Sequence, residues 1–364
     1  MDQEKQADFG SKLTDILNHG ALNLALALGY QLEIFDVMAD MDRPVSCPDL
    51  ARAAGLHPRY VQEWLGIMCT GQIVELHGNR PEETTYYLPP EHAALLIRKS
   101  GSGNMGVYTQ EIPLLTQTAM ARVAEDFSKG EGIPYEVYPG FQAFMAQLSH
   151  AKHRQVLVRH FLPGVDDGRL MARLEKGIRV CDMGCGQGIA LHLMAEKFPA
   201  SSFTGIDNDE PAIAKARSQA SELGLENSTF LVKDAAAIYG DPDFFQAYDY
   251  ITAFDAIHDQ SRPLEALKAV RHMLAPDGMF SMIDIDAASH PAGNLDHPMG
   301  PFLYTVSLMH CMPVGLSDKG RGLGMMWGRG QAVSLLTKAG FENVQVFEMD
   351  HDPFNVHYQC RSRR

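Results

Sequence analysis

The sequence predicts an α/β protein in which a mainly helical domain precedes a domain built on a parallel sheet. From about residue 175 onward, short β-like runs alternate with helical runs, which indicates βαβ units. The first 100 residues instead contain helical runs followed by a single strand–turn–strand pattern. We therefore divide the chain into 1–100, 101–174 and 175–364. The middle segment is expected to be a helical linker that also contributes to a substrate cavity.

Length, charge and cysteine usage narrow the class of protein. A chain of 364 residues suffices for about two domains of ~100–200 residues. Its formal net charge of -14 argues against extended contact with nucleic acid or an anionic membrane. We find no apolar run of ~18 residues and no secretory signal, so no membrane partner is expected. The six cysteines have no regular spacing, which favours reduced thiols and a cytoplasmic location.

The first 100 residues have the outline of a winged helix. Apolar residues recur at helical spacing between Leu13 and Met38, almost without charge. Two further helical runs follow, SCPDLARAAGL and HPRYVQEWLGIMCTG, the second with a proline in its first turn. The runs IVELHG and TTYYLPP then predict two short antiparallel strands. Helices followed by such a hairpin are typical of winged-helix domains.

This domain lacks the charge that DNA binding needs. Between Met1 and Ser100, Asp and Glu outnumber Lys and Arg, and the run HPRYVQEWLGIM offers Arg59 as its single basic residue. We therefore predict a dimerisation and substrate-closing module, a homodimer, and no nucleic-acid partner. A ligand-sensing transcription regulator remains the alternative from another functional class.

The strongest chemical signal is the run VCDMGCGQGIALHL. A strand from Ile178 to Met183 leads into glycines at alternate positions and then directly into a helix, which is a Rossmann-like ligand-binding turn. The spacing is G-x-G-x-G rather than the G-x-G-x-x-G of nicotinamide oxidoreductases. Asp182 stands two residues before the first glycine, where a carboxylate would repel a pyrophosphate. It suits a cationic ligand such as S-adenosylmethionine, with its sulfonium and ammonium groups.

Two further acids follow at the ends of predicted strands. Asp207 closes FTGIDND about twenty residues after the glycine turn, where a carboxylate can accept hydrogen bonds from ribose hydroxyls. Asp234 closes FLVKDA. Either acid alone is more often a helix cap. Acids at the ends of three successive strands instead indicate a ligand site, because the carboxyl edge of an open α/β sheet is where ligands bind.

The motif D-x-G-x-G-x-G and the two strand-end acids resemble the class I S-adenosylmethionine-dependent methyltransferases over about residues 175–290. The resemblance implies a class I methyltransferase sheet. It also implies that the glycine turn holds the methionine part of the cofactor, Asp207 the ribose and Asp234 the adenine. The cofactor-binding residues expected from it are Asp182, Gly184, Cys185, Gly186, Gly188, Asp207, Asn208, Asp234, Ala235 and Phe254.

The run DAIHDQSRPLEALKAVRHMLAPDGMFSMID is similar to a segment of the plant-type O-methyltransferases, which also have an N-terminal winged-helix domain. This resemblance implies that His258 is the catalytic base, since an imidazole can take a proton from a hydroxyl as its oxygen attacks the methyl group. Gln260 stands where that family has Trp. No Glu can be recognised in the sequence as the partner that orients the imidazole.

Over nearly the whole chain, PRYVQEWL, GIPYEVYPGF, FDAIHDQ and YTVSLMHCMPVGL resemble a bacterial-type group of winged-helix methyltransferases. The predicted function is direct methyl transfer from S-adenosylmethionine to a small molecule, with O-methylation and His258 as base. An N- or S-methyltransferase that works by alignment, without a base, remains the alternative.

The segment 297–328 follows the fifth strand and is predicted to form the wall of a site for an apolar or aromatic acceptor. His310 and Cys311 could bind a metal, but no second ligand pair has suitable spacing, so we predict none. The substrate-binding residues expected are Tyr138, Tyr304, Met309, His310 and Trp327.

Overall fold

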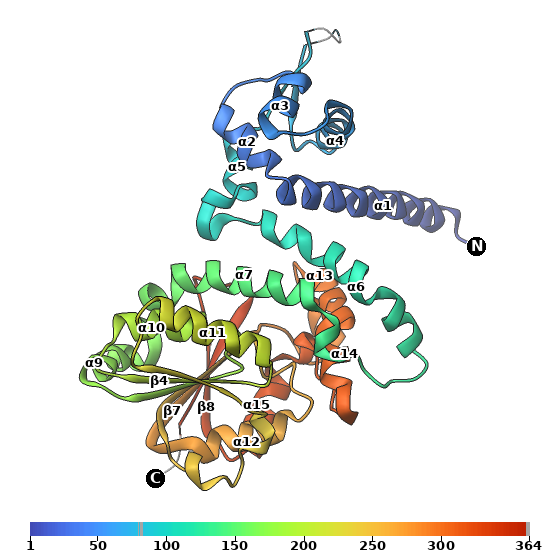
Figure 1. Ribbon diagram of the computed structural model, residues 1–364. Helices are drawn as coiled ribbons and strands as arrows, with labels where there is room; N and C mark the ends of the chain where they lie inside the picture. The colour runs from blue at the N-terminus through green and yellow to red at the C-terminus, as the bar shows by residue number, and fades with distance from the viewer. Residues whose placement is uncertain (79, 81–82, 362–364) are drawn as a thin grey trace. The chain divides into compact units, whose positions relative to one another are not determined.

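The computed structural model describes residues 1–78, 80 and 83–361. The chain forms two compact units, Met1–Leu114 and Leu115–Arg364 (Figure 1). The segment 101–174, predicted as a linker, contributes residues to both units.

The first unit has the predicted order of helices followed by a hairpin. β1 and β2 pair antiparallel, with Leu76 opposite Tyr86. The apolar run predicted between Leu13 and Met38 lies on two helices, because Glu33 takes a left-handed conformation (φ 59°) between them. The elements are α1 (Gln3–Gln31), α2 (Ile34–Met41), α3 (Cys47–Ala54), α4 (Pro58–Thr70), β1 (Glu75–His77), β2 (Thr85–Tyr87) and α5 (Pro90–Leu96).

Trp64 joins three helices of this unit. Its indole N–H donates to the carbonyl of Ala25 on α1 at 2.9 Å, and its ring packs edge-on against Phe35 of α2, with centroids 5.2 Å apart. Gly29 faces the same ring, where a Cβ would lie 2.6 Å from Trp64. The close approach of α1 to α4 therefore depends on a residue without a side chain.

The second unit contains a seven-stranded sheet in the order β5-β4-β3-β6-β7-β9-β8. β9 runs antiparallel to both of its neighbours, while the pairs from β5 to β7 are parallel. This confirms the predicted α/β class with a mostly parallel sheet. The strands are β3 (Arg179–Met183), β4 (Ser202–Asp207), β5 (Ser228–Val232), β6 (Tyr248–Phe254), β7 (Leu274–Ile285), β8 (Glu342–Glu348) and β9 (Asn355–Arg361).

Helices cover both faces of the sheet, with α10 and α11 on one face and α12 and α15 on the other (Figure 1). Along β3, Val180 packs with the first pair and Cys181 with the second, because successive side chains of a strand point to opposite faces. The helices are α6 (Glu111–Asp126), α7 (Pro139–Val156), α8 (Leu162–Gly164), α9 (Arg169–Lys176), α10 (Ile189–Lys197), α11 (Glu210–Glu222), α12 (Pro263–Met273), α13 (Gly300–Val306), α14 (Met312–Leu316) and α15 (Gly328–Lys338).

The parallel register brings the ends of neighbouring strands together. Asp182 on β3 lies opposite Thr252 on β6, Asp207 on β4 opposite Val232 on β5, and Phe254 on β6 opposite Ile283 on β7. The predicted strand-end residues therefore share one edge of the sheet. Within the described ranges, no single helix is long and apolar enough to cross a bilayer; α1 and α2 taken together, bent by 69°, meet that test by length and composition alone.

The packing of Gly29 generates a stability prediction. Gly29→Ala should lower the free energy of unfolding by about 1–3 kcal/mol, because the new methyl group meets the buried ring of Trp64. Gly10→Ala, on the same helix with no described atom within 4 Å of its Cβ, is the matched control and should be neutral or stabilising by up to about 1 kcal/mol. Urea unfolding of both variants measures the difference. Equal effects would contradict the Trp64 contact.

Candidate active site

The glycine turn after β3 depends on its three glycines for their backbone conformation and for the space around them. Gly184, Gly186 and Gly188 all have positive φ values, of 73°, 51° and 75°. A Cβ on Gly184 would lie 2.5 Å from Ala256, and one on Gly188 would lie 2.5 Å from Phe230. Gly186 differs, since no described atom lies within 4 Å of the position its Cβ would take. The backbone at Gly186 is therefore open to a ligand.

Asp207 ties the end of β4 to this turn. One carboxylate oxygen accepts from the backbone N–H of Gly186 at 2.8 Å, and the other accepts from Asp209 at 2.9 Å. Burial raises the pKa of Asp207. Asp207, the acid predicted to bind the ribose, therefore also holds the glycine turn in place. Asn208, predicted to share this role, follows Asp207 in the chain.

Asp182 is a second acid at the same edge, and its side chain is buried. It accepts a hydrogen bond from the Thr252 hydroxyl at 2.7 Å. Burial raises the pKa of Asp182 to about 7, although the bond from Thr252 opposes the shift. Among residues 1–78, 80 and 83–361, neither Asp182 nor Asp207 forms an ion pair with Lys, Arg or His. The edge therefore holds negative charge that a cationic ligand would compensate.

Asp234 and Phe254 are engaged by neighbours that the sequence did not indicate. Asp234 caps the short turn at Ala235 by accepting from the N–H of Ala236 at 2.9 Å, and its other oxygen accepts from Arg262. Phe254 packs edge-on against Phe161, with ring centroids 5.6 Å apart.

His258 lies in the loop after β6 and is fully enclosed. Its Nδ1 is 2.7 Å from Oδ1 of Asp284, a buried carboxylate on β7, which assigns the proton to Nδ1. The same oxygen accepts from the Ile285 N–H at 2.9 Å and from the Trp327 indole at 3.1 Å. The orienting carboxylate that sequence reasoning missed is therefore an aspartate. It is the last residue but one of β7, within the run GMFSMIDID that Asp286 ends, so a search for acids near strand ends would have offered both aspartates.

Acids on two sides control the protonation of His258. Burial lowers its pKa, but Asp284 and Asp259 act in the opposite direction and raise it well above the usual value. Oδ1 of Asp259 lies 3.4 Å from Nε2. The free protein therefore stabilises the imidazolium form.

Cys311 completes this cluster. Its Sγ, a ring nitrogen of His258 and a carboxylate oxygen of Asp259 all lie within 4.8 Å of one another, close enough to share a cation. Burial raises the pKa of the Cys311 thiol to about 12, so the metal-free site holds a thiol rather than a thiolate.

The residues predicted to bind substrate fall into two groups. Tyr138 contacts both Met309 and His310. Its hydroxyl donates to the Met309 carbonyl at 2.9 Å, and the centroids of the Tyr138 and His310 rings are 4.8 Å apart. Trp327 instead contacts the site through Asp284, and the Tyr304 hydroxyl accepts from Asn294 at 3.0 Å.

Sequence reasoning also missed Tyr135, which belongs to the run GIPYEVYPGF. Its ring lies 5.8 Å from that of His310. Burial raises the pKa of Tyr135, and the negative charges of Asp259 and Asp207 add to the shift. Tyr135 therefore lies within electrostatic reach of both the glycine-turn acids and the His258 cluster.

Comparison with known proteins agrees with this geometry. Residues 174–299 match a methyltransferase domain, and residues 20–98 match an Rv2258c-like winged HTH domain. Trans-aconitate 2-methyltransferase from Variovorax paradoxus is 31% identical over 131 residues, 35% of this chain and 46% of that protein. A probable (S)-tetrahydroprotoberberine N-methyltransferase from Papaver bracteatum is 26% identical over 123 residues, 34% of this chain and 32% of that protein. The chain thus spans less than half the length of these two relatives.

Solved structures match the fold over its whole length. Human N-acetylserotonin methyltransferase superposes with a TM-score of 0.69 at 16% identity, covering 100% of this chain and 99% of that one. An O-methyltransferase-like protein from Nostoc punctiforme gives a TM-score of 0.71 at 15% identity, with 97% and 98% covered. The chain therefore contains an S-adenosylmethionine-dependent methyltransferase domain, preceded by a winged-helix domain, and its fold is similar to that of these solved methyltransferases.

Proposed function

We propose that the protein transfers a methyl group from S-adenosylmethionine to a hydroxyl of a small-molecule acceptor, with His258 as the general base. The observation that carries this proposal is the buried His258–Asp284 pair in the loop after β6, at the same sheet edge as the glycine turn. The methyltransferase domain indicates methyl transfer, and the His258–Asp284 pair is the reason to propose a hydroxyl as the group that accepts the methyl.

The residues present fit the cofactor. Gly186 leaves backbone open, and Asp182 and Asp207 hold negative charge without a basic partner in the described chain. When bound, S-adenosylmethionine supplies a methyl group activated by a sulfonium. Asp182, with Gly184, Cys185, Gly186 and Gly188, would hold its methionine part. Asp207 and Asn208 would hold the ribose, and Asp234, Ala235 and Phe254 the adenine.

The hydrogen bond to Asp284 selects the tautomer that a base needs. With Nδ1–H donating to the carboxylate, neutral His258 presents the lone pair of Nε2, which can accept the proton of an acceptor hydroxyl. Asp284 then stabilises the imidazolium that forms. A thioether or a tertiary amine has no proton to lose, so N- or S-methylation by alignment alone remains the alternative. The similarity to an N-methyltransferase keeps that alternative open. The relatives and solved structures to which the chain is similar do not support a role as a transcription regulator.

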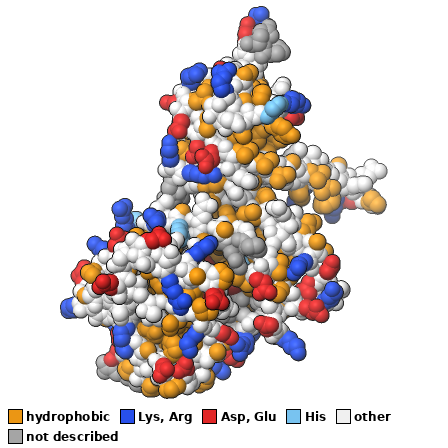
Figure 2. Space-filling model, viewed as in Figure 1, with side chains coloured by type: hydrophobic (Ala, Val, Ile, Leu, Met, Phe, Trp, Pro, Cys, Tyr) orange, Lys and Arg blue, Asp and Glu red, His pale blue; other side chains and the backbone are white. Residues whose placement is uncertain are grey.

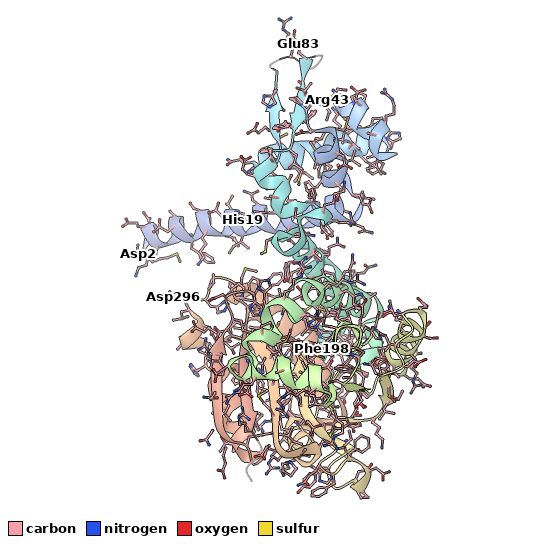
Figure 3. All side chains as sticks on the ribbon, turned by 90° about the vertical axis from the view of Figure 1, so that its left-hand side faces the viewer. Asp2, His19, Arg43, Glu83, Phe198 and Asp296 are labelled. Carbon is pink, nitrogen blue, oxygen red and sulfur yellow. The ribbon has the colours of Figure 1, made fainter. Side chains whose placement is uncertain are left out.

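Two further parts of the proposal concern assembly and location. On α1, large apolar side chains are exposed at helical spacing along one stripe, and Figure 2 shows hydrophobic side chains gathered on this helix. Figure 3 shows the length of the helix from Asp2 past His19. We infer that a second copy of the chain covers this stripe. We also propose a cytoplasmic location, because all six cysteines are free thiols, as is usual for proteins in a reducing compartment. The stripe consists of Phe9, Leu13, Ile16, Leu17, Leu24 and Leu28.

Cofactor choice can be measured by calorimetry. S-adenosylmethionine or its demethylated product should bind in the micromolar range, and NAD should not bind. Asp207→Ala should weaken binding by roughly 1.5–3 kcal/mol, the scale of charge-assisted hydrogen bonds, while the exposed Asp167→Ala should have no effect. Because Asp182 has a pKa of about 7, affinity for the cation should rise between about pH 6 and pH 8 as the carboxylate ionises. Tight binding of NAD, together with no binding of S-adenosylmethionine or its demethylated product, would contradict the cofactor assignment.

The role of His258 can be tested by single-turnover methyl transfer. His258→Ala should slow the reaction by roughly 10²–10⁴-fold with unchanged cofactor affinity, because the hydroxyl then lacks a proton acceptor. His357→Ala is the matched control, since His357 is another buried histidine, bonded to Ser281 instead. The rate should also survive a chelator, since no metal is predicted at the His258, Asp259 and Cys311 cluster. A loss under about fivefold in His258→Ala rejects the base.

The pH dependence of His258 gives a second measurement. His258 must be neutral to act, and its raised pKa means that the rate should fall as pH drops through a value above 6.5, by about tenfold per pH unit. NMR titration of His258 in the free protein should also give a midpoint above 6.5. Asp284→Asn should lower that midpoint, because it removes a negative charge beside the imidazole. A midpoint below 6.5 contradicts this. The titratable groups facing His258 are Asp284, Asp259, Cys311, Asp255 and His310.

The assembly can be tested by light scattering. The wild type should have twice the monomer mass of 40.2 kDa at micromolar concentration. Leu17→Glu places a charge in the apolar stripe and should shift the protein toward monomer, whereas Lys12→Glu, off the stripe on the same helix, should not. A wild-type monomer, or salt-dependent binding to random DNA, would contradict the proposal.

A further inference from the structure

A pocket lies at the edge of the sheet opposite the candidate active site. The loop before β6, the C-terminal part of α12 and the C-terminal end of α15 line it, and its volume is about 250 Å³. These segments lead into β6, β7 and β8, which run parallel and therefore start at the same edge. Because β6 has seven residues, the pocket lies roughly 20 Å from the edge that carries the glycine turn. Its basic and ring-bearing lining residues are Lys268, Arg271, Lys338, Tyr239, Phe245 and His272.

Lys268 and Arg271 of α12 and Lys338 of α15 give this pocket three positive charges, and no acidic side chain lines it. Within the described part of the chain, none of the three side chains has an ion pair or a hydrogen bond, although Lys268 and Arg271 are half-buried. In a chain with a net charge of -14, unpaired cations gathered in one pocket indicate a site for an anion.

The ends of the two helices account for part of this charge. A helix carries about half a negative charge at its C-terminal end, so α12 and α15 together offset about one of the three positive charges. Lys268 precedes the last turn of α12, which is the range in which this effect acts. The pocket therefore retains about two positive charges for a ligand.

Exposed aromatic rings form the other wall of the pocket. Tyr239 and Phe245 are 62% and 58% exposed, and their ring centroids lie 5.9 and 5.3 Å from that of His272. The His272 Nε2–H donates to the Asp241 carbonyl at 2.8 Å, and the Gln246 N–H donates to the His272 carbonyl at 3.0 Å. Gln246 has a φ of 52°, a conformation uncommon for a residue with a side chain and frequent at ligand sites. The loop is thus fixed to α12 while its rings stay accessible to a flat ligand.

We propose that this pocket binds a nucleoside phosphate, with the base against Tyr239 and Phe245 and the phosphate groups at Lys268, Arg271 and Lys338. A flat ring and several negative charges in one molecule match both walls. The volume is below the ~300–1,000 Å³ of sites that enclose a whole ligand, so part of the nucleotide remains in solvent.

This site is separate from the proposed cofactor site. S-adenosylmethionine also contains an adenine, but Asp182 and Asp207 at the glycine turn would repel phosphate groups. The two sites therefore select opposite charges on ligands that share a base. Single-stranded nucleic acid and anionic lipid carry similar groups, but the small pocket and the negative net charge favour a single nucleotide.

Calorimetry at low salt, without divalent metal ions, tests the proposal with ATP, adenosine and tripolyphosphate. The wild type should bind ATP at least about tenfold more tightly than tripolyphosphate, because the base adds stacking. It should also bind ATP at least about tenfold more tightly than adenosine, because the phosphates add charge-assisted hydrogen bonds. Saturating S-adenosylhomocysteine should leave ATP binding unchanged.

Variants assign the two walls. Lys268→Gln combined with Arg271→Gln should weaken ATP about tenfold or more. Tyr239→Ala and Phe245→Ala should each weaken ATP by about fivefold to a hundredfold, with tripolyphosphate binding unchanged. Lys197→Gln is the matched control and should have no effect, since Lys197 is an exposed cation in the last turn of α10 and does not line the pocket.

Several results would overturn the inference. Unchanged ATP affinity in the Lys268 and Arg271 double variant would show that ATP binds elsewhere, and displacement of ATP by S-adenosylhomocysteine would place it in the cofactor site. Equal binding of ATP and tripolyphosphate would leave only a simple anion site. Binding of poly(U) or phosphatidylserine vesicles that depends on Lys268 and Arg271, without binding of ATP, would assign this surface to nucleic acid or to a membrane.

Discussion

One oxygen of Asp284 accepts hydrogen bonds from His258, from the backbone of Ile285 and from the Trp327 indole. This oxygen connects the loop after β6, the end of β7 and the segment that leads into α15. Because Asp284 is fully buried, each of these bonds forms in a medium where an unpaired donor would be destabilising. The position of His258 therefore depends on the end of β7 and on the segment before α15 as well as on the loop that carries it.

Charge at the sheet edge is organised in two different ways. Around His258, acids stabilise a positive imidazolium within the protein. At the glycine turn, Asp182 and Asp207 receive hydrogen bonds from Thr252 and from backbone N–H groups, which satisfy their oxygens without neutralising the charge. The turn therefore attracts a cation when these carboxylates are ionised, which for Asp182 requires a pH above its pKa of about 7. Of the three acids predicted to bind the cofactor, Asp234 differs from Asp182 and Asp207 because it forms an ion pair with Arg262.

The features that sequence analysis predicted are those set by local spacing. The glycine turn, Asp182 and the acids at 207 and 234 could be predicted because each stands at the end of a run whose period indicates a strand. The pairing of His258 with Asp284 joins positions 26 residues apart, and the Trp327 contact joins positions 43 apart. Which strand lies next to which decides both contacts, and no short motif encodes that order. The break between α1 and α2 was missed for a different reason, since Glu33 adopts a left-handed conformation that its residue type does not signal.

The position of β9 has a consequence for biosynthesis. This strand comes last along the described chain, yet it lies between β7 and β8 within the sheet. During synthesis the segment 355–361 emerges after all the other described strands. Until then β7 and β8 each have an edge without a pairing partner. The winged-helix unit, Met1–Leu114, is synthesised completely before the first strand of this sheet, and domains generally fold as units during synthesis. A nascent chain stalled shortly before residue 355 would thus carry one folded unit and one open sheet, the state in which chaperones would recognise it.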